Sequence, residues 1–199
     1  MQNLTDPVGL PGLIAILVGF AGFTIALLAA RRRKGAESKE TVAMKASITW
    51  LWIAVQSIGI GLAGLGSIRV ELDPDSPKAI VEGVVVLALM TATIGIFDAS
   101  SRAMGKNWAL VARTREDHIL VQTGPFARIR HPIYVALFLF MLALAVAFGH
   151  THALMIAVPV YALGTWLRVV QEERLLRAQF GTVYDNYAGR VKRFVPGVF

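Results

Sequence analysis

Long apolar stretches without charge dominate this chain and constrain its fold more than any other feature. Residues 8–30 and 46–68 contain no Asp, Glu, Lys or Arg, and residues 80–97 carry only Glu82, near one end. A helix of about 20 such residues crosses the hydrocarbon core of a bilayer. These three stretches therefore predict three membrane-spanning helices.

Two shorter apolar stretches follow, residues 133–148 and 153–167, joined by Gly149-His150-Thr151-His152. Each falls short of the usual span of about 20 residues, but paired and packed against other helices they are expected to cross as a tight hairpin. The predicted fold is an all-α integral membrane helical bundle of about five transmembrane helices that ends in a helical hairpin. The first half of the polar tail after Arg168 is also predicted to be helical.

The basic residues predict the orientation of this bundle. Of the 20 Lys and Arg residues, all but Arg69 and Lys78 fall on one side of the membrane when five crossings are drawn. Because cytoplasmic loops are enriched in Lys and Arg, the N-terminus is expected outside and the C-terminus in the cytoplasm. The net charge of +7 lies between apolar blocks and not on a soluble basic face, so no nucleic-acid partner is expected.

Two local motifs are best explained by structure. Gly59-Ile-Gly61-Leu-Ala-Gly64 matches a dinucleotide-binding fingerprint, but it lies inside an apolar span with no strand before it, which favours close helix packing. The chain has no cysteine, and His150 and His152 sit in a turn without nearby carboxylates. No metal site is predicted from so poor a ligand set.

The chemically informative residues lie in two later segments. The first runs from His118-Ile119-Leu120-Val121 through Gly124-Pro125-Phe126 to Arg130-His131-Pro132-Ile133-Tyr134. Pro132 suits the first position of a helix, so His131 is expected to cap a helix start, an end that attracts carboxylates or phosphates. A plain basic turn beside the membrane explains the same residues equally well.

The second segment, Arg168-Val-Val-Gln-Glu172-Glu173, continues the last apolar stretch. Arg168 and Glu172 are four residues apart and share a helix face, whereas Glu173 points about 100° away. They form either a surface salt bridge with positive-inside anchoring or a charged pair that holds a ligand, since adjacent carboxylates on a membrane helix are costly unless paired. Tyr184 and Tyr187 in the tail could stack on a ligand or belong to the interfacial aromatic belt.

Taken together, these segments resemble the isoprenylcysteine carboxyl methyltransferase family of integral membrane methyltransferases. The family pattern is H-x-L-V-x-x-G-x-[YF], then R-H-P-x-Y, an apolar hairpin, R-x-x-x-E-E and F-G-x-x-Y-x-x-Y. It is met from His118 to Phe126, from Arg130 to Tyr134, and by Arg168, Glu172, Glu173, Phe180, Gly181, Tyr184 and Tyr187. A family glutamine falls on Val111 here, and residues 1–97 carry no matching motif.

The resemblance implies an S-adenosyl-L-methionine-dependent O-methyltransferase that acts at the membrane on the carboxylate of an isoprenylcysteine-like lipophilic substrate. It implies one membrane domain, 1–199, with three N-terminal spans in 1–97 and a catalytic core with a cytoplasmic cofactor pocket in 98–199. Arg168 would bind the substrate carboxylate, and Arg168 and Glu172 would form the catalytic pair. The implied cofactor contacts are His118, Ile119, Leu120, Val121, Phe126, His131, Pro132, Ile133, Tyr134 and Glu172.

A carboxylate substrate has a pKa of about 4 and needs no general base near neutral pH, so positioning and electrostatics would suffice. Two other activities stay open at this point. A phospholipid or amine N-methyltransferase shares the membrane architecture, but its cationic substrate would face Arg168 unfavourably. A sterol-reductase-like membrane enzyme would bind NADPH instead. The partners expected are a prenylated or lipophilic substrate and membrane lipid.

Overall fold

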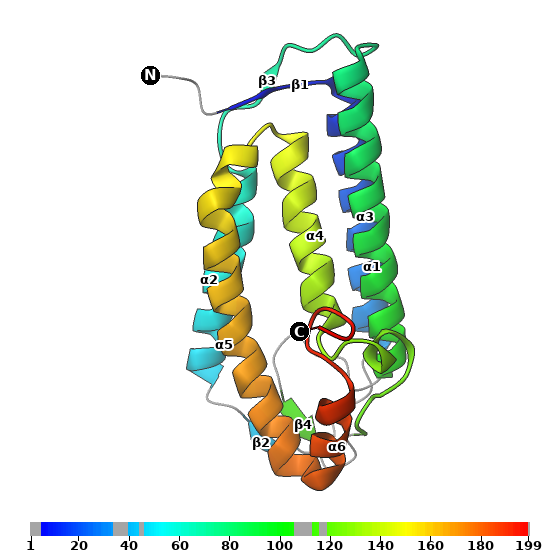
Figure 1. Cartoon of the computed structure of the whole chain (residues 1–199), viewed down its shortest axis with the longest axis vertical. Helices are drawn as coiled ribbons and strands as arrows, with labels where there is room; N and C mark the ends of the chain where they lie inside the picture. The colour runs from blue at the N-terminus through cyan, green and yellow to red at the C-terminus, as the bar shows by residue number, and fades with distance from the viewer. Residues whose placement is uncertain (1–4, 34–39, 44–45, 106–112, 116–118, 199) are drawn as a thin grey trace.

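The computed structural model describes residues 5–33, 40–43, 46–105, 113–115 and 119–198. Five long helices run up and down along one axis, and a short sixth helix, α6, closes one end (Figure 1). Their bounds are α1 (Leu10–Arg33), α2 (Ala46–Gly64), α3 (Pro77–Met104), α4 (Pro132–Ala147), α5 (Leu154–Phe180) and α6 (Thr182–Arg190). The prediction of an all-α membrane helical bundle is confirmed.

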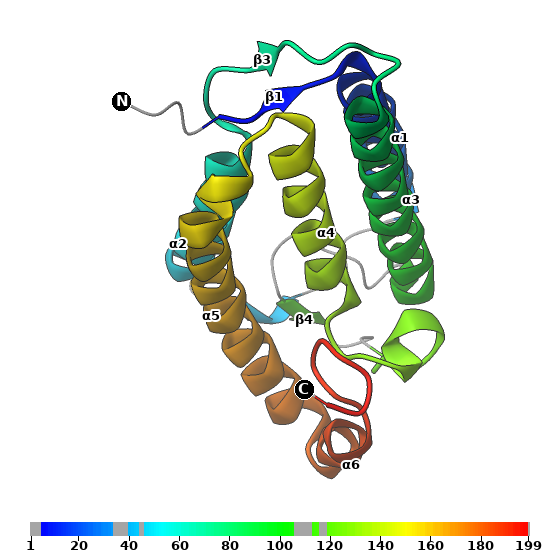
Figure 2. The ribbon, with the colours of Figure 1, turned by 45° about the horizontal axis from the view of Figure 1, so that its top comes forward.

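Small elements join the helices at both ends of the bundle. Strand β1 (Pro7–Val8) pairs in parallel with β3 (Arg69–Val70), and β2 (Glu40–Ala43) pairs antiparallel with β4 (Arg113–Arg115). Figure 2 shows these two pairs at opposite ends of the bundle. Two short 3₁₀ helices, η2 (Gly124–Ala127) and η3 (Thr151–Ala153), precede α4 and α5. Elements this short leave no hydropathy pattern, so none of them was predicted.

Among the residues that the structure describes, three helical segments are long and apolar enough to cross a membrane: Leu10–Arg33, Pro77–Met104 and Thr151–Phe180. The shorter apolar helices, within α2 and at α4, match the remaining two predicted spans. α4 lies inside the bundle, where Ala136, Ala143 and Ala147 are fully buried against α1 and α3. Burial on several sides explains how a helix of 16 residues is accommodated.

One helix end differs from the sequence-based expectation, and another agrees with it. α2 ends at Gly64, before residue 68, because Gly66 adopts a φ of +148° that a helix cannot contain. α5 continues beyond the apolar stretch to Phe180, which agrees with the predicted helix in the first half of the tail. Gly181, with a φ of +51°, caps it by donating its N–H to the Arg177 carbonyl. Apolar content therefore marks the spanning part of α5 but not its end.

The outer faces of the helices are apolar. Leu17 on α1 is 69% exposed, Val81 on α3 is 60% exposed and Met155 on α5 is 81% exposed. A water-soluble protein rarely exposes so many large apolar side chains. These faces suit contact with lipid.

Helix ends that carry basic residues meet at one end of the bundle, the lower end of the ribbon in Figure 1. α1 ends in Arg31–Arg33, Arg102 lies in the last turn of α3, Arg130 comes just before α4, and Arg168 lies in the second half of α5. Arg33 bridges α1 to α3 there, with its guanidinium 3.1 Å from the Asp98 carboxylate and 2.9 Å from the Ser101 hydroxyl. Arg69 and Lys78 lie at the other end.

Close packing joins α2 to α5 through glycine. A Cβ on Gly59 would lie 2.6 Å from the backbone nitrogen of Tyr161, and a Cβ on Gly164 would lie 2.6 Å from the backbone nitrogen of Gln56. The two helix backbones are therefore in direct contact at these positions. This agrees with the packing interpretation of the glycine-rich motif.

We expect Gly59→Ala to push α2 away from α5 and to destabilise the fold by ~1–3 kcal/mol, because the added methyl group meets backbone. Thermal unfolding in detergent measures this effect. Gly61→Ala is the matched control, since its Cβ would meet only the Leu65 side chain, at 3.8 Å. Equal melting temperatures for the two variants would contradict the packing argument.

Candidate active site

The start of α4 is held by the C-terminal tail. The backbone N–H of Arg130 donates to the Lys192 carbonyl at 2.8 Å, and that of His131 donates to the Arg193 carbonyl at 3.0 Å. The ring of Phe194 then lies 5.9 Å from the ring of His131. His131 occupies the N-cap position of α4 as predicted, but its side chain makes no capping hydrogen bond and turns towards α5 instead.

Glu173 is the buried centre of this end, with a side chain only 1% exposed. Its carboxylate accepts hydrogen bonds from Arg130 Nη2 at 2.9 Å and from Arg193 Nη2 at 2.8 Å, and His131 Nε2 lies 3.2 Å away. The hydrogen bond to Glu173 raises the pKa of Arg193. Glu173 thus ties α5 to both the start of α4 and the tail.

Glu172 faces a different set of groups. It accepts a hydrogen bond from the Tyr134 hydroxyl, and its carboxylate lies 3.7 Å from His131 Nδ1 and 3.8 Å from Arg168 Nη2. His131 therefore lies between the two adjacent carboxylates, with one ring nitrogen towards each. The side chain of Glu172 is 22% exposed, so it remains accessible to a ligand.

Arg168 is held from two sides. Its guanidinium carbon lies 5.0 Å from the centre of the Tyr134 ring, and Nη1 donates to Gln56 Oε1 on α2 at 2.8 Å. The amide nitrogen of Gln56 in turn donates to Thr165 Oγ1 at 2.7 Å. The fork of Arg168 is thereby fixed between an aromatic face and a buried amide.

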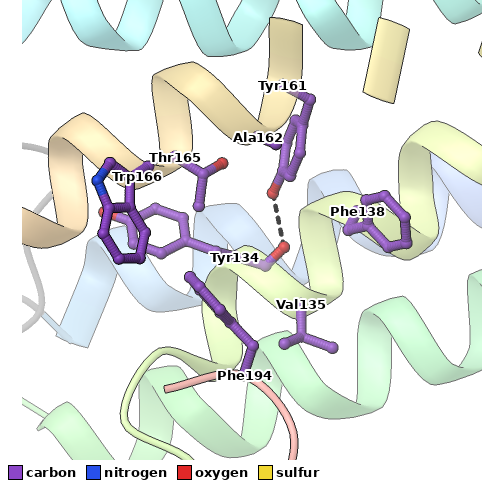
Figure 3. Close-up of a pocket in the computed structure, with 8 residues that line it drawn as sticks. All are labelled: Tyr134, Val135, Phe138, Tyr161, Ala162, Thr165, Trp166 and Phe194. Carbon is purple, nitrogen blue, oxygen red and sulfur yellow. Dashed lines mark hydrogen bonds between the residues drawn. The ribbon is translucent and has the colours of Figure 1, made fainter. Parts of the chain in front are cut away.

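An apolar cavity of about 450 Å³ lies beside this cluster, between α4 and α5 (Figure 3). Its size is that of pockets that hold small organic molecules. The Tyr161 hydroxyl donates to the Tyr134 carbonyl at 2.6 Å and so fixes one side of the cavity. The residues that line it are Tyr134, Val135, Phe138, Tyr161, Ala162, Thr165, Trp166 and Phe194.

The tail tyrosines are structural. Tyr187 donates its hydroxyl to the Phe126 carbonyl at 2.7 Å, and burial raises the pKa of Tyr187 to about 12. Tyr184 is fully buried beside it, and burial together with the charge of Glu173 raises its pKa as well. Neither is among the residues that line the cavity, and the hydrogen bond of Tyr187 joins α6 to η2.

The predicted site residues are therefore only partly gathered. His131, Tyr134, Arg168 and Glu172 meet beside the cavity, whereas Ile133 packs on the opposite side of α4 against α1 and α3. The segment that precedes α4 does not line the cavity, and Ile119 in it is 64% exposed. The same segment contains the predicted contacts Leu120, Val121 and Phe126. The predicted contact Pro132 is buried at the start of α4. His118 and Val111 lie outside the described residues.

Three contributors were not predicted. Gln56 could have been identified from the sequence, because a lone amide in a membrane span is expected to hydrogen-bond a polar group on another helix. Trp166 lines the cavity and stacks under Arg193, whose guanidinium carbon lies 4.9 Å from the ring centre. Phe194 reaches the cavity only because the tail folds back, which no local pattern reveals.

Comparison with known proteins agrees with the motif resemblance. The model of the phospholipid methyltransferase family matches residues 81–183. The nickel-cobalt-cadmium resistance protein NccN of Alcaligenes xylosoxydans xylosoxydans is 31% identical over 59% of this chain and 62% of its own length.

Two relatives are named protein-S-isoprenylcysteine O-methyltransferase. That of Schizosaccharomyces pombe is 29% identical over 44% of the chain and 37% of its own length. That of Tribolium castaneum is 31% identical over 40% of the chain and 28% of its own length. The chain spans less than two thirds of the length of each of these relatives.

The family match extends from α3 to the start of α6 and so contains Arg130, His131, Tyr134, Arg168 and Glu172. It covers half of the chain, and the relatives with the prenylcysteine methyltransferase name align at about the same identity as NccN. The chain belongs to the family of phospholipid and isoprenylcysteine membrane methyltransferases.

Proposed function

We propose that the chain is an S-adenosyl-L-methionine-dependent methyltransferase that methylates the carboxylate of an isoprenylcysteine-like lipid. The observation that carries this proposal is the contact of Arg168 and Glu172 with His131 and Tyr134 at the polar end of an apolar cavity. A cation, a carboxylate and an apolar chamber are the three environments that such a reaction requires.

The groups at the polar end fit the cofactor. S-adenosyl-L-methionine supplies, when bound, a methyl group on a positively charged sulfur. Glu172 is a partly exposed carboxylate that would attract this charge, and the aromatic ring of Tyr134 would pack on a flat base. His131, which lies beside Glu172 at the start of α4, would contact the cofactor's amino-acid part.

Arg168 suits the substrate. Its planar fork can bind a carboxylate through two parallel hydrogen bonds, which would orient one oxygen towards the cofactor side of the site. The lining of the cavity is apolar and aromatic, so a hydrocarbon chain fits there better than a charged group. The lipid would enter from the bilayer between α4 and α5.

The proposed orientation places the basic end of the bundle in the cytoplasm. Arg31–Arg33, Arg102, Arg130 and the charged part of α5 share this end, as the positive-inside rule favours. The N-terminus would then lie outside and the C-terminus inside. Residues 98–199 would form the catalytic core, and the preceding spans would support it, α2 through Gln56.

A methyl-transfer assay tests the proposal. Purified protein in detergent or vesicles is incubated with radiolabelled S-adenosyl-L-methionine and, separately, an S-prenylcysteine acid or a lipid amine. Label in a base-labile ester of the acid supports the proposal. Label in the lipid amine alone would assign the chain to N-methylation, and NADPH binding without methyl transfer would favour a reductase.

We expect Glu172→Gln to weaken S-adenosyl-L-methionine binding by about 10- to 100-fold. This change in Kd corresponds to the free energy that a hydrogen bond to a charged group typically contributes. Glutamine keeps the shape and the hydrogen bond from Tyr134 but removes the negative charge. Calorimetry in detergent measures the Kd. Glu82→Gln is a matched control, because Glu82 accepts a hydrogen bond from the Gly9 N–H, far along the chain from the site. Unchanged cofactor affinity in Glu172→Gln would remove Glu172 from the cofactor site.

A further inference from the structure

Gln56 is an unusual residue for the middle of a membrane helix. It lies on α2 within an uncharged stretch, its side chain is buried, and α2 precedes the family match at residues 81–183. Burying an amide in an apolar region is unfavourable unless its donor and acceptor are both satisfied. Here both are satisfied by α5, through Thr165 and Arg168.

The orientation of this amide follows from its partners. Arg168 can only donate, so the atom of Gln56 that faces it at 2.8 Å must be the carbonyl oxygen. The amide nitrogen then points to the Thr165 hydroxyl at 2.7 Å. The close approach of α2 at Gly164 brings the amide within reach of a side chain one helical turn further along α5.

The charge of the acceptor matters as much as its position. Arg168 already forms an ion pair with Glu172, at 3.8 Å, and Glu172 also accepts a hydrogen bond from Tyr134. The neutral amide of Gln56 holds the guanidinium without adding a second negative charge. A carboxylate at position 56 would instead form a full salt bridge with Arg168 and would compete with an anionic ligand.

We infer that Gln56 is a positioning residue that fixes Arg168 through a neutral acceptor and so leaves Arg168 without a second counter-charge that would compete with the anionic group of the substrate. The inference rests on the proposed function and explains how the site would select an anionic substrate. It also gives one of the first three helices a role in the site.

Gln56→Glu is the sharpest test, because it changes charge with almost no change in shape. Glutamate can accept from both Arg168 and the Thr165 hydroxyl, so the melting temperature should not fall. The measured quantity is the ratio of the Kd values for an S-prenylcysteine acid and for its uncharged methyl ester, taken in detergent. We expect wild type to prefer the acid by about tenfold, and Gln56→Glu to bind both equally while keeping its affinity for S-adenosyl-L-methionine.

Gln56→Met separates position from charge. Methionine has a similar length but cannot accept the hydrogen bond, so Arg168 keeps its charge and loses its support. We expect kcat to fall by about tenfold with a smaller change in KM, whereas Gln56→Glu is expected to change the ratio of the Kd values for acid and ester. Thr93→Val is the control for loss of a buried interhelical hydrogen bond, since Thr93 bonds to the Leu89 and Ala136 carbonyls. It should retain wild-type kinetics.

The outcomes separate the two levels of the argument. A wild-type protein that does not distinguish acid from ester would overturn the proposed function and this inference together. A wild-type preference that Gln56→Glu fully retains, or a Gln56→Met variant with unchanged kcat, would overturn the inference alone and leave the proposed function standing.

Discussion

Replacing Arg168 with alanine should lower kcat/KM for a carboxylate substrate by roughly 10²- to 10³-fold, the loss typical of removing a group that orients or stabilises reacting charge. The side chain lies over Tyr134 and against Gln56, so its charged fork is fixed in place before a ligand arrives. Binding of S-adenosyl-L-methionine should survive, because Glu172 and His131 remain. Steady-state kinetics and calorimetry on the same preparation measure the two effects.

Two further variants define what Arg168 contributes. Arg168→Lys keeps the charge but cannot bind Gln56 and a carboxylate with the same geometry, so it should recover only part of the activity. Arg174→Ala removes an exposed cation from the same helix and should leave the kinetics unchanged. If Arg168→Ala turned over the substrate at the wild-type rate, Arg168 would have no place in the reaction.

Much of the helical architecture could be predicted from the sequence, because spanning helices depend on local hydropathy alone. All five apolar stretches became helices, and the loop before Pro132 ends where α4 begins. Spacing alone placed Arg168 and Glu172 on one helix face, and the family resemblance implied that they meet His131. The helices could therefore be predicted from local hydropathy, and the site residues from one ordered sequence motif.

The parts that escaped prediction depend on long-range contacts. Phe194 lines the cavity because residues after α6 fold back onto Arg130 and His131. No hydrophobic pattern in the sequence predicts this long-range contact. Gln56 reaches Arg168 only because two glycines bring α2 and α5 into contact. The adjacent Glu172 and Glu173 have different partners for a similar reason, since the tail supplies Arg193 to one of them.

The buried position of Glu173 gives the largest expected effect on stability. Glu173→Ala should destabilise the fold by ~3–5 kcal/mol, because it leaves the buried Arg130 and the partly buried Arg193 without their counter-charge. The same change should release the tail, since Arg193 loses both of its hydrogen bonds to the carboxylate. Thermal unfolding measures the first effect, and tryptic cleavage after Lys192 or Arg193 measures the second.

A matched control lies one helix further along the chain. Asp185 pairs with Arg177 at 3.0 Å, but the two side chains are 58% and 48% exposed, so Asp185→Ala should change stability by at most about 0.5 kcal/mol. Glu173→Gln, which keeps the size but not the charge, should fall between the two variants. If Glu173→Ala melted like Asp185→Ala and the tail stayed resistant to trypsin, the ion cluster would not be what holds the tail, and Phe194 would need another anchor at the cavity.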